Sequence, residues 1–120
     1  MNLTVWIVSG LLAAMFLLSG VMKVPATKES VAGNPRMGWA APFPIELIKV
    51  IGVAEIAGAT GLILPRAFDT ATWLVPAAAI GLVVVMAGAI ITHARRTEWS
   101  SVAVNAVLLA LALFVAIERF

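Results

Sequence analysis

Four long apolar stretches are the feature that most constrains how this chain can fold. They cover residues 3–22, 45–64, 72–92 and 101–117. A helix of about 20 residues crosses the roughly 30 Å hydrocarbon core of a bilayer, and it satisfies its own backbone hydrogen bonds there. The pattern therefore predicts an all-α fold, an integral membrane four-helix bundle formed by a single domain over residues 1–120.

The composition favours the same class of fold. Of the 120 residues, 62% are hydrophobic and only 12% are charged. A small domain with so much apolar surface could not cover it in water, whereas in lipid it has no need to do so. A cleaved signal peptide is the alternative reading of the first stretch. That stretch lacks both a basic leading segment and a clear Ala-x-Ala site, which disfavours the alternative.

The connections between the stretches predict how the helices are arranged. Residues 65–71 and 93–101 are short enough to require antiparallel neighbours. Residues 24–44 form a longer connection that contains several prolines and glycines and carries Trp39. Tryptophan is enriched at the membrane–water interface, so this segment is expected there, as an interfacial loop or as a short helix that caps the bundle.

Lysine and arginine are unevenly distributed between the two sides of the predicted bundle. The side with the first and third connections carries Lys23, Lys28, Arg36, Arg95 and Arg96, and the other side carries Arg66 and Arg119. Cytoplasmic loops are enriched in these two residue types. We therefore expect a multi-pass protein of the bacterial inner (plasma) membrane with both termini outside.

Glu55 is an ionisable residue within the second apolar stretch. A charged group at that depth is costly and normally faces the bundle interior, where it marks a site. Helical spacing places it on one face with Ile48, Gly52, Ala59 and Leu62, and with Gly58 at the edge of that face. This predicts a ligand, proton or partner site at Glu55. The alternative is a carboxyl group that only forms a hydrogen bond to a neighbouring helix.

Lys23 ends the first stretch and His93 ends the third, so both lie at the same side of the predicted membrane. Each of them taken alone is an ordinary interfacial residue. Together with Glu55 they form a candidate ligand-binding cluster. Glu55 lies about ten residues, or roughly 15 Å, from either end of its helix. Contact therefore requires the long side chain of Lys23 or a deeper position of His93.

Other small or polar residues in the apolar stretches are expected to serve helix packing. They are Gly52, Gly58, Gly81, Gly88 and Asn105. Glycine lets two helices approach closely, and asparagine can form hydrogen bonds across a helix interface. The glycines at positions 81 and 88 would pack against a helix of the same protomer or of a second copy, which makes a homo-oligomer a candidate assembly.

Several classes of site are disfavoured by residues that the chain lacks. It has no cysteine and a single histidine. This excludes thiolate metal sites and cysteine nucleophiles, so no metal site is predicted. No phosphate-binding or hydrolase motif is present, and the basic side chains are read as topology signals rather than as a nucleic-acid surface. No catalytic residue is assigned, and an accessory or binding role is favoured over independent catalysis.

The chain resembles the DoxX-like family of small four-helix membrane proteins. The resemblance is carried by Ser-Gly-Val-Met-Lys-Val at 19–24, Ile-Gly-Val-Ala-Glu-Ile-Ala-Gly-Ala at 51–59, Gly-Leu-Ile-Leu-Pro at 61–65 and Ala-Ile-Ile-Thr-His-Ala-Arg-Arg at 89–96. It implies a four-helix bundle, and it implies that Lys23, Glu55 and His93 match the polar motif residues of the family.

The functions that this resemblance implies are varied. The family name derives from a subunit associated with thiosulfate:quinone oxidoreductase and terminal oxidase activity, and other members are linked to thiol systems or quinone resistance. A quinone is therefore the cofactor that the resemblance suggests, and the leading hypothesis is an accessory subunit that binds a quinone or lipid-like ligand beside a membrane redox partner. A eukaryotic relative that assists receptor assembly suggests the alternative, a non-enzymatic membrane scaffold or assembly chaperone. Transport of a small solute or proton ranks lowest.

Overall fold

Four long helices make up most of the chain. They are α1 (Asn2–Lys23), α3 (Ile45–Ala67), α4 (Leu74–Arg95) and α5 (Trp99–Arg119). The computed structural model describes residues 2–120, except for the side chains of residues 2 and 36. Each of the four helices is long and apolar enough to cross a membrane. The predicted all-α membrane bundle is therefore confirmed, and the protein is a multi-pass membrane protein.

The boundary at the end of α3 differs from the apolar stretch in the sequence. The helix continues past Pro65 to Ala67 instead of ending at Leu64. Proline lacks a backbone N–H and removes one hydrogen bond of the helical ladder. Here the bond that is missing is the one to the carbonyl of Gly61, one turn earlier, and the helix still extends two residues past the proline.

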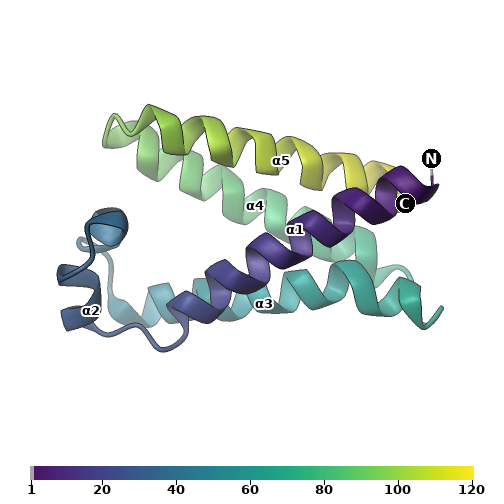
Figure 1. Cartoon of the computed structure of the whole chain (residues 1–120), viewed down its shortest axis with the longest axis horizontal. Helices are drawn as coiled ribbons and strands as arrows, with labels where there is room; N and C mark the ends of the chain where they lie inside the picture. The colour runs from purple at the N-terminus through teal and green to yellow at the C-terminus, as the bar shows by residue number, and fades with distance from the viewer. Residues whose placement is uncertain (1) are drawn as a thin grey trace.

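The helices form two antiparallel pairs, α1 with α3 and α4 with α5 (Figure 1). Contacts of α3 with α4, and fewer contacts of α1 with α5, join the pairs. Both termini lie at the end where α3 connects to α4, and the α4–α5 turn lies at the opposite end with the long α1–α3 connection. The two pairs diverge toward this second end.

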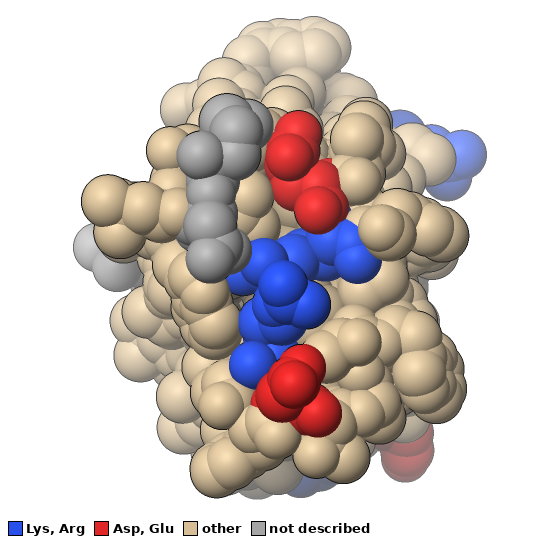
Figure 2. Space-filling view, turned by 90° about the vertical axis from the view of Figure 1, so that its right-hand side faces the viewer, with Lys and Arg blue, Asp and Glu red and all other residues tan. Residues whose placement is uncertain are grey.

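The end that holds the termini is closed by side chains from all four helices. Buried residues of the main core include Leu12, Leu62, Val75 and Val115. At the surface of this end the Arg119 guanidinium lies 5.2 Å from the centre of the Trp6 ring. Figure 2 views this end directly and shows basic side chains gathered at its centre with acidic side chains on either side.

The opposite end is covered by the α1–α3 connection, which contains two short helices, α2 (Lys28–Ala32) and η1 (Pro35–Ala40). The side chain of Thr27 accepts a hydrogen bond from the Ser30 backbone, and the side chain of Ser30 accepts one from the Thr27 backbone. A second hydrophobic cluster, whose buried members are Ala26, Val31, Ala40 and Ile48, fixes both short helices against the start of α3. Of the two expected forms of this segment, the structure has short helices.

Candidate functional site

The inward face of α3 presents its single mid-helix carboxylate to the bundle interior. The buried residues of α3 are Ile48, Gly52, Glu55, Gly58, Ala59 and Leu62. This is the face that helical spacing predicts. Glu55 is only 2% exposed. A carboxylate buried to this degree needs partners, because isolated charges are very unfavourable in an apolar interior.

Two side chains from the last turns of α1 supply those partners. Lys23 Nζ lies 2.8 Å from Glu55 Oε1. Ser19 Oγ donates to both Glu55 oxygens, at 3.2 Å and 3.1 Å, and itself accepts a hydrogen bond from Lys23 Nζ. These three residues form a polar triad in which Glu55 is buried and Lys23 and Ser19 are partly buried, and it has no net charge when the lysine and the carboxylate are both ionised.

The contact between Lys23 and Glu55 depends on a close crossing of α1 and α3. A Cβ atom placed on Gly20 would lie 2.5 Å from the Gly52 carbonyl oxygen, and one placed on Gly52 would lie 2.8 Å from Lys23 Cβ. Only glycine allows backbones to approach this closely. The crossing brings the end of α1 beside the middle of α3, so Lys23 reaches Glu55 with an ordinary side-chain length.

Lys49 strengthens the same junction from α3. Its Nζ donates to the backbone carbonyl of Val24 at 2.8 Å. The last carbonyl groups of a helix have no partner within that helix and favour nearby positive charge. Lys49 therefore anchors the end of α1 and does not line the cavity described below.

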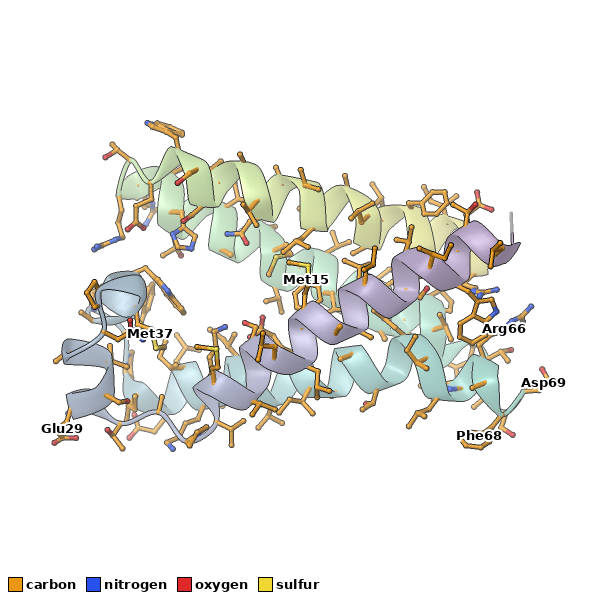
Figure 3. The ribbon with its side chains drawn as sticks, in the orientation of Figure 1. Met15, Glu29, Met37, Arg66, Phe68 and Asp69 are labelled. Carbon is orange, nitrogen blue, oxygen red and sulfur yellow. The ribbon has the colours of Figure 1, made fainter. Side chains whose placement is uncertain are left out.

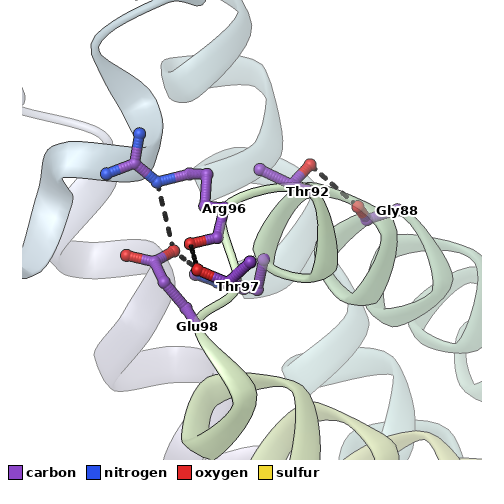
Figure 4. A network of polar contacts seen from close by, with 6 residues as sticks. Gly88, Thr92, Arg96, Thr97 and Glu98 are labelled. Carbon is purple, nitrogen blue, oxygen red and sulfur yellow. Dashed lines mark hydrogen bonds and ion pairs between the residues drawn. The ribbon is translucent and has the colours of Figure 1, made fainter.

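His93 does not contact Glu55, because it pairs with a different carboxylate. His93 Nδ1 lies 2.8 Å from Glu98 Oε1, on the turn between α4 and α5. The same oxygen accepts a hydrogen bond from Arg96 Nε at 3.2 Å (Figure 4). The hydrogen bond with His93, followed by the influence of Arg96, lowers the pKa of Glu98 below its ordinary value of 4.5, against an opposing effect of desolvation.

Trp39 of η1 lies between the Lys23–Glu55 and His93–Glu98 pairs. Lys23 Nζ lies 5.8 Å from the centre of its ring, within the range of a cation–π interaction. The His93 ring lies edge-on at 6.0 Å between ring centres. The three sequence-predicted residues are thus brought to one region, with Lys23 and Glu55 in direct contact and His93 joined to Lys23 through the indole.

A cavity of about 520 Å³ lies beside these groups. Its lining residues come from η1, the segment that follows it, and all four long helices: Met15, Phe16, Ser19, Lys23, Trp39, Phe43, Leu47, Ile51, Glu55, Val84, Val85, Met86, Gly88, Ala89, Thr92, His93, Asn105 and Leu108. Most of them are apolar. The polar members include the Lys23–Ser19–Glu55 triad, His93 and Asn105, so the cavity is amphipathic.

The cavity opens to the outer surface of the bundle within the membrane-spanning region. Met15, Leu47 and Val84 line it, and they are 48%, 40% and 66% exposed. Met15 lies between the two helix pairs (Figure 3), and Val84 lies near the middle of α4. An apolar chain inside the cavity can therefore leave sideways between helices into lipid.

The residues expected to serve helix packing lie in different surroundings. A Cβ atom on Gly58 would lie 2.7 Å from the Leu82 side chain, so Gly58, like Gly52, lies at a close helix contact. No atom lies within 4 Å of a Cβ placed on Gly81 or Gly88 in the described part of the chain. Asn105 lines the cavity. Packing of the two open glycines against a second copy stays a prediction.

One contributor to this region, Glu98, has little signal in the sequence. Glu98 lies in a short turn, where no periodic pattern predicts which way a side chain points. The one hint in the sequence is that it follows His93 by five residues. Asn105 lines the cavity, and its expected role in helix packing stays a prediction. In the described residues, no three His, Asp or Glu side chains group closely enough to hold a metal ion.

Comparison with known proteins identifies one family. A family model described as the DoxX-like family matches residues 7–115. No curated protein and no solved structure matches the chain. The match includes α3, α4, the α1–α3 connection, most of α1 and α5, and every residue that lines the cavity.

Proposed function

The chain belongs to the DoxX-like family, and from its amphipathic cavity we propose that it is an accessory protein that binds a quinone or a similar lipid-like molecule in a redox-linked membrane system. Lys23, Glu55 and His93 are the proposed ligand-binding residues. The protein would act beside a membrane redox partner that carries out electron transfer, because the chain has no cysteine of its own for thiol chemistry.

The single observation that carries this proposal is the separation of polar and apolar side chains on the walls of the cavity. The buried Glu55 and its partly buried partner Lys23 lie on one wall, apolar side chains form most of the rest, and an opening leads to the lipid-facing surface. Ligand sites commonly measure about 300–1,000 Å³ and combine apolar walls with a few polar groups that orient the ligand. A head group at the triad and a tail that leaves between helices suit this shape.

The chemistry of the polar groups supports a ligand that accepts hydrogen bonds. Lys23 has three N–H donors, of which one is directed to Ser19 and one to Glu55, so a third is free for an oxygen of the ligand. The Trp39 ring provides an adjacent flat surface. In the protein interior such a hydrogen bond is stronger than in water, because the dielectric constant is low.

We propose the bacterial inner membrane as the location, with both termini outside. The support is the uneven distribution of lysine and arginine. The end with α2, η1 and the α4–α5 turn carries more of them than the end with the termini and the α3–α4 connection. Positive residues are retained on the cytoplasmic side.

The proposal is tested by native mass spectrometry and lipid extraction of the protein purified from its own membrane into nanodiscs. We expect the wild type to retain a quinone or lipid-like molecule and Glu55→Gln to lose it. Glu46→Gln is the matched control, because it removes an exposed carboxylate of the same helix that does not line the cavity. A wild type that carries no such molecule, and that binds none in titration, would contradict the proposal.

A scaffold or assembly role is the second candidate. It is favoured by the open space beside Gly81 on α4, which lies outside the cavity lining and has no helix partner in the described chain. We expect Gly81→Val to abolish co-purification of a membrane protein if this role is correct, while ligand retention is unchanged. Co-purification that survives the substitution would argue against it.

A further inference from the structure

Asn105 presents a polar group to the cavity from the helix that lies across from Glu55. In the bundle α1 packs with α3, α3 with α4, α4 with α5 and α5 with α1, so α3 and α5 are diagonally opposed. Glu55 is on α3 and Asn105 on α5, and both line the same cavity. The two residues therefore act on its contents from opposite walls.

The Asn105 carboxamide has no hydrogen-bond partner in the described part of the chain. It lies seven residues into α5, a membrane-spanning helix, and is half-buried. A carboxamide has two N–H donors and one acceptor, and polar groups without partners are unfavourable at membrane depth. A partner that enters the cavity from outside the chain would satisfy it.

The charge balance of the lining restricts what this partner can be. The charged side chains that line the cavity are Lys23 and Glu55, which neutralise each other at 2.8 Å, and His93 already has Glu98 as its partner. A phosphate or carboxylate head group would place an uncompensated negative charge beside Glu55. A neutral head group that accepts hydrogen bonds avoids this repulsion.

The surface between the two polar walls is apolar. Phe16, Met86 and Leu108 line the cavity and are 2%, 5% and 9% exposed, as members of the main core. A head group between Lys23 and Asn105 therefore needs an apolar centre and polar atoms at its edges. A ring with an oxygen acceptor at each of two opposite positions has this distribution.

We propose that Asn105 is a further ligand-binding residue, and that the cavity selects a neutral ring with two opposed oxygen acceptors, one toward Lys23 and one toward Asn105. This inference rests on the proposed function and defines the class of head group. The ring would lie against the apolar core residues, and its tail would leave through the lateral opening.

The test is calorimetric titration of the nanodisc-embedded protein with two probes of equal tail length, a decyl-substituted 1,4-benzoquinone and a decyl-substituted phenol. We expect Asn105→Leu to lower the affinity for the dicarbonyl probe about tenfold, which is the effect of one lost hydrogen bond. The affinity for the phenol should not change. Asn105→Thr, which replaces the carboxamide with a hydroxyl donor, should weaken binding of the dicarbonyl probe less. Val107→Leu on the exposed face of α5 is the control, with no change expected for either probe.

The outcomes separate this inference from the function on which it rests. If wild type and Asn105→Leu bind the dicarbonyl probe with equal affinity, and Glu55→Gln no longer binds it, the role of Asn105 is overturned and the proposed function stands. Absence of binding by the wild type would overturn both. A wild-type homo-oligomer that Asn105→Leu dissociates, measured by native mass spectrometry, would show that a second copy is the partner of Asn105 and would also overturn the inference.

Discussion

Two carboxylates lie near the polar end of the cavity, and each is paired with two side chains. The Glu55 side chain is 3% exposed and is paired with Lys23 and Ser19, whereas the Glu98 side chain is 35% exposed and is paired with His93 and Arg96. Glu55 lies within a membrane-spanning helix and Glu98 lies on a turn. The number and geometry of partners are similar, so burial is the main difference.

That difference determines how strongly each pair affects the fold. A charge left unpaired in a buried site loses its compensation and cannot be rescued by water, whereas an exposed charge is solvated and screened by salt. The α1–α3 junction is therefore expected to be a rigid, energetically important contact. The contacts of Glu98 with His93 and Arg96 on the α4–α5 turn are expected to be weaker, and their strength is expected to depend on pH and salt.

The largest effect is expected from breaking the buried pair. Lys23→Met removes the cation and leaves Glu55 without its charge partner, so we expect a loss of about 3–5 kcal/mol in the free energy of unfolding. The measurement is unfolding by SDS in mixed micelles. The double variant Lys23→Met/Glu55→Leu should recover much of the loss, because it leaves no buried charge. If the double variant is no more stable than the single one, the ion pair is not the source of the effect.

A smaller effect is expected from moving the buried pair apart without altering its charges. Gly52→Ala places a methyl group where a Cβ lies 2.8 Å from Lys23 Cβ, so α1 and α3 must separate. Overpacking of this kind costs about 1–3 kcal/mol. Gly10→Ala is the matched control, because a Cβ there meets no atom within 4 Å. Equal unfolding curves for the two variants would argue against the close crossing.

The smallest effect is expected at the exposed pair, and it should depend on pH. The hydrogen bond with His93 lowers the pKa of Glu98 in the folded protein below 4.5. The ionised carboxylate therefore stabilises the fold fully above pH 4.5, and this contribution is lost as the pH falls through the lower folded-state pKa. Thermal unfolding of wild type and Glu98→Gln should differ slightly at pH 6 and converge as the pH falls below 4.5. A difference that is constant across this range would indicate that Glu98 ionisation contributes nothing.

Much of this site was accessible from the sequence because α-helices have a fixed period. The four apolar stretches predict the four spans, and the inward face of α3 follows from a spacing of three and four residues. Lys23 and His93 are predicted to lie at the same side of the membrane, because consecutive helices run antiparallel. These inferences depend only on local geometry, which the order of residues largely determines.

Other features required the packing of helices against one another. The close crossing at Gly20 and Gly52 sets how far α1 extends along α3, and this offset decides that Lys23 contacts Glu55. The fold of residues 24–44 decides that Trp39 lies between Lys23 and His93. Neither distance has a local signal, because each depends on contacts between residues far apart in the chain.

The sequence by itself determined the class of the protein, the number of spans and the inward direction of Glu55, because hydrophobicity and helical period are properties of short segments. Only the tertiary structure decided which residue neutralises Glu55, that His93 pairs with Glu98, and that Asn105 lines a cavity. The physical reason is that a cavity forms where helices diverge. That divergence results from the combined close contacts of several helices and is encoded in no single one of them.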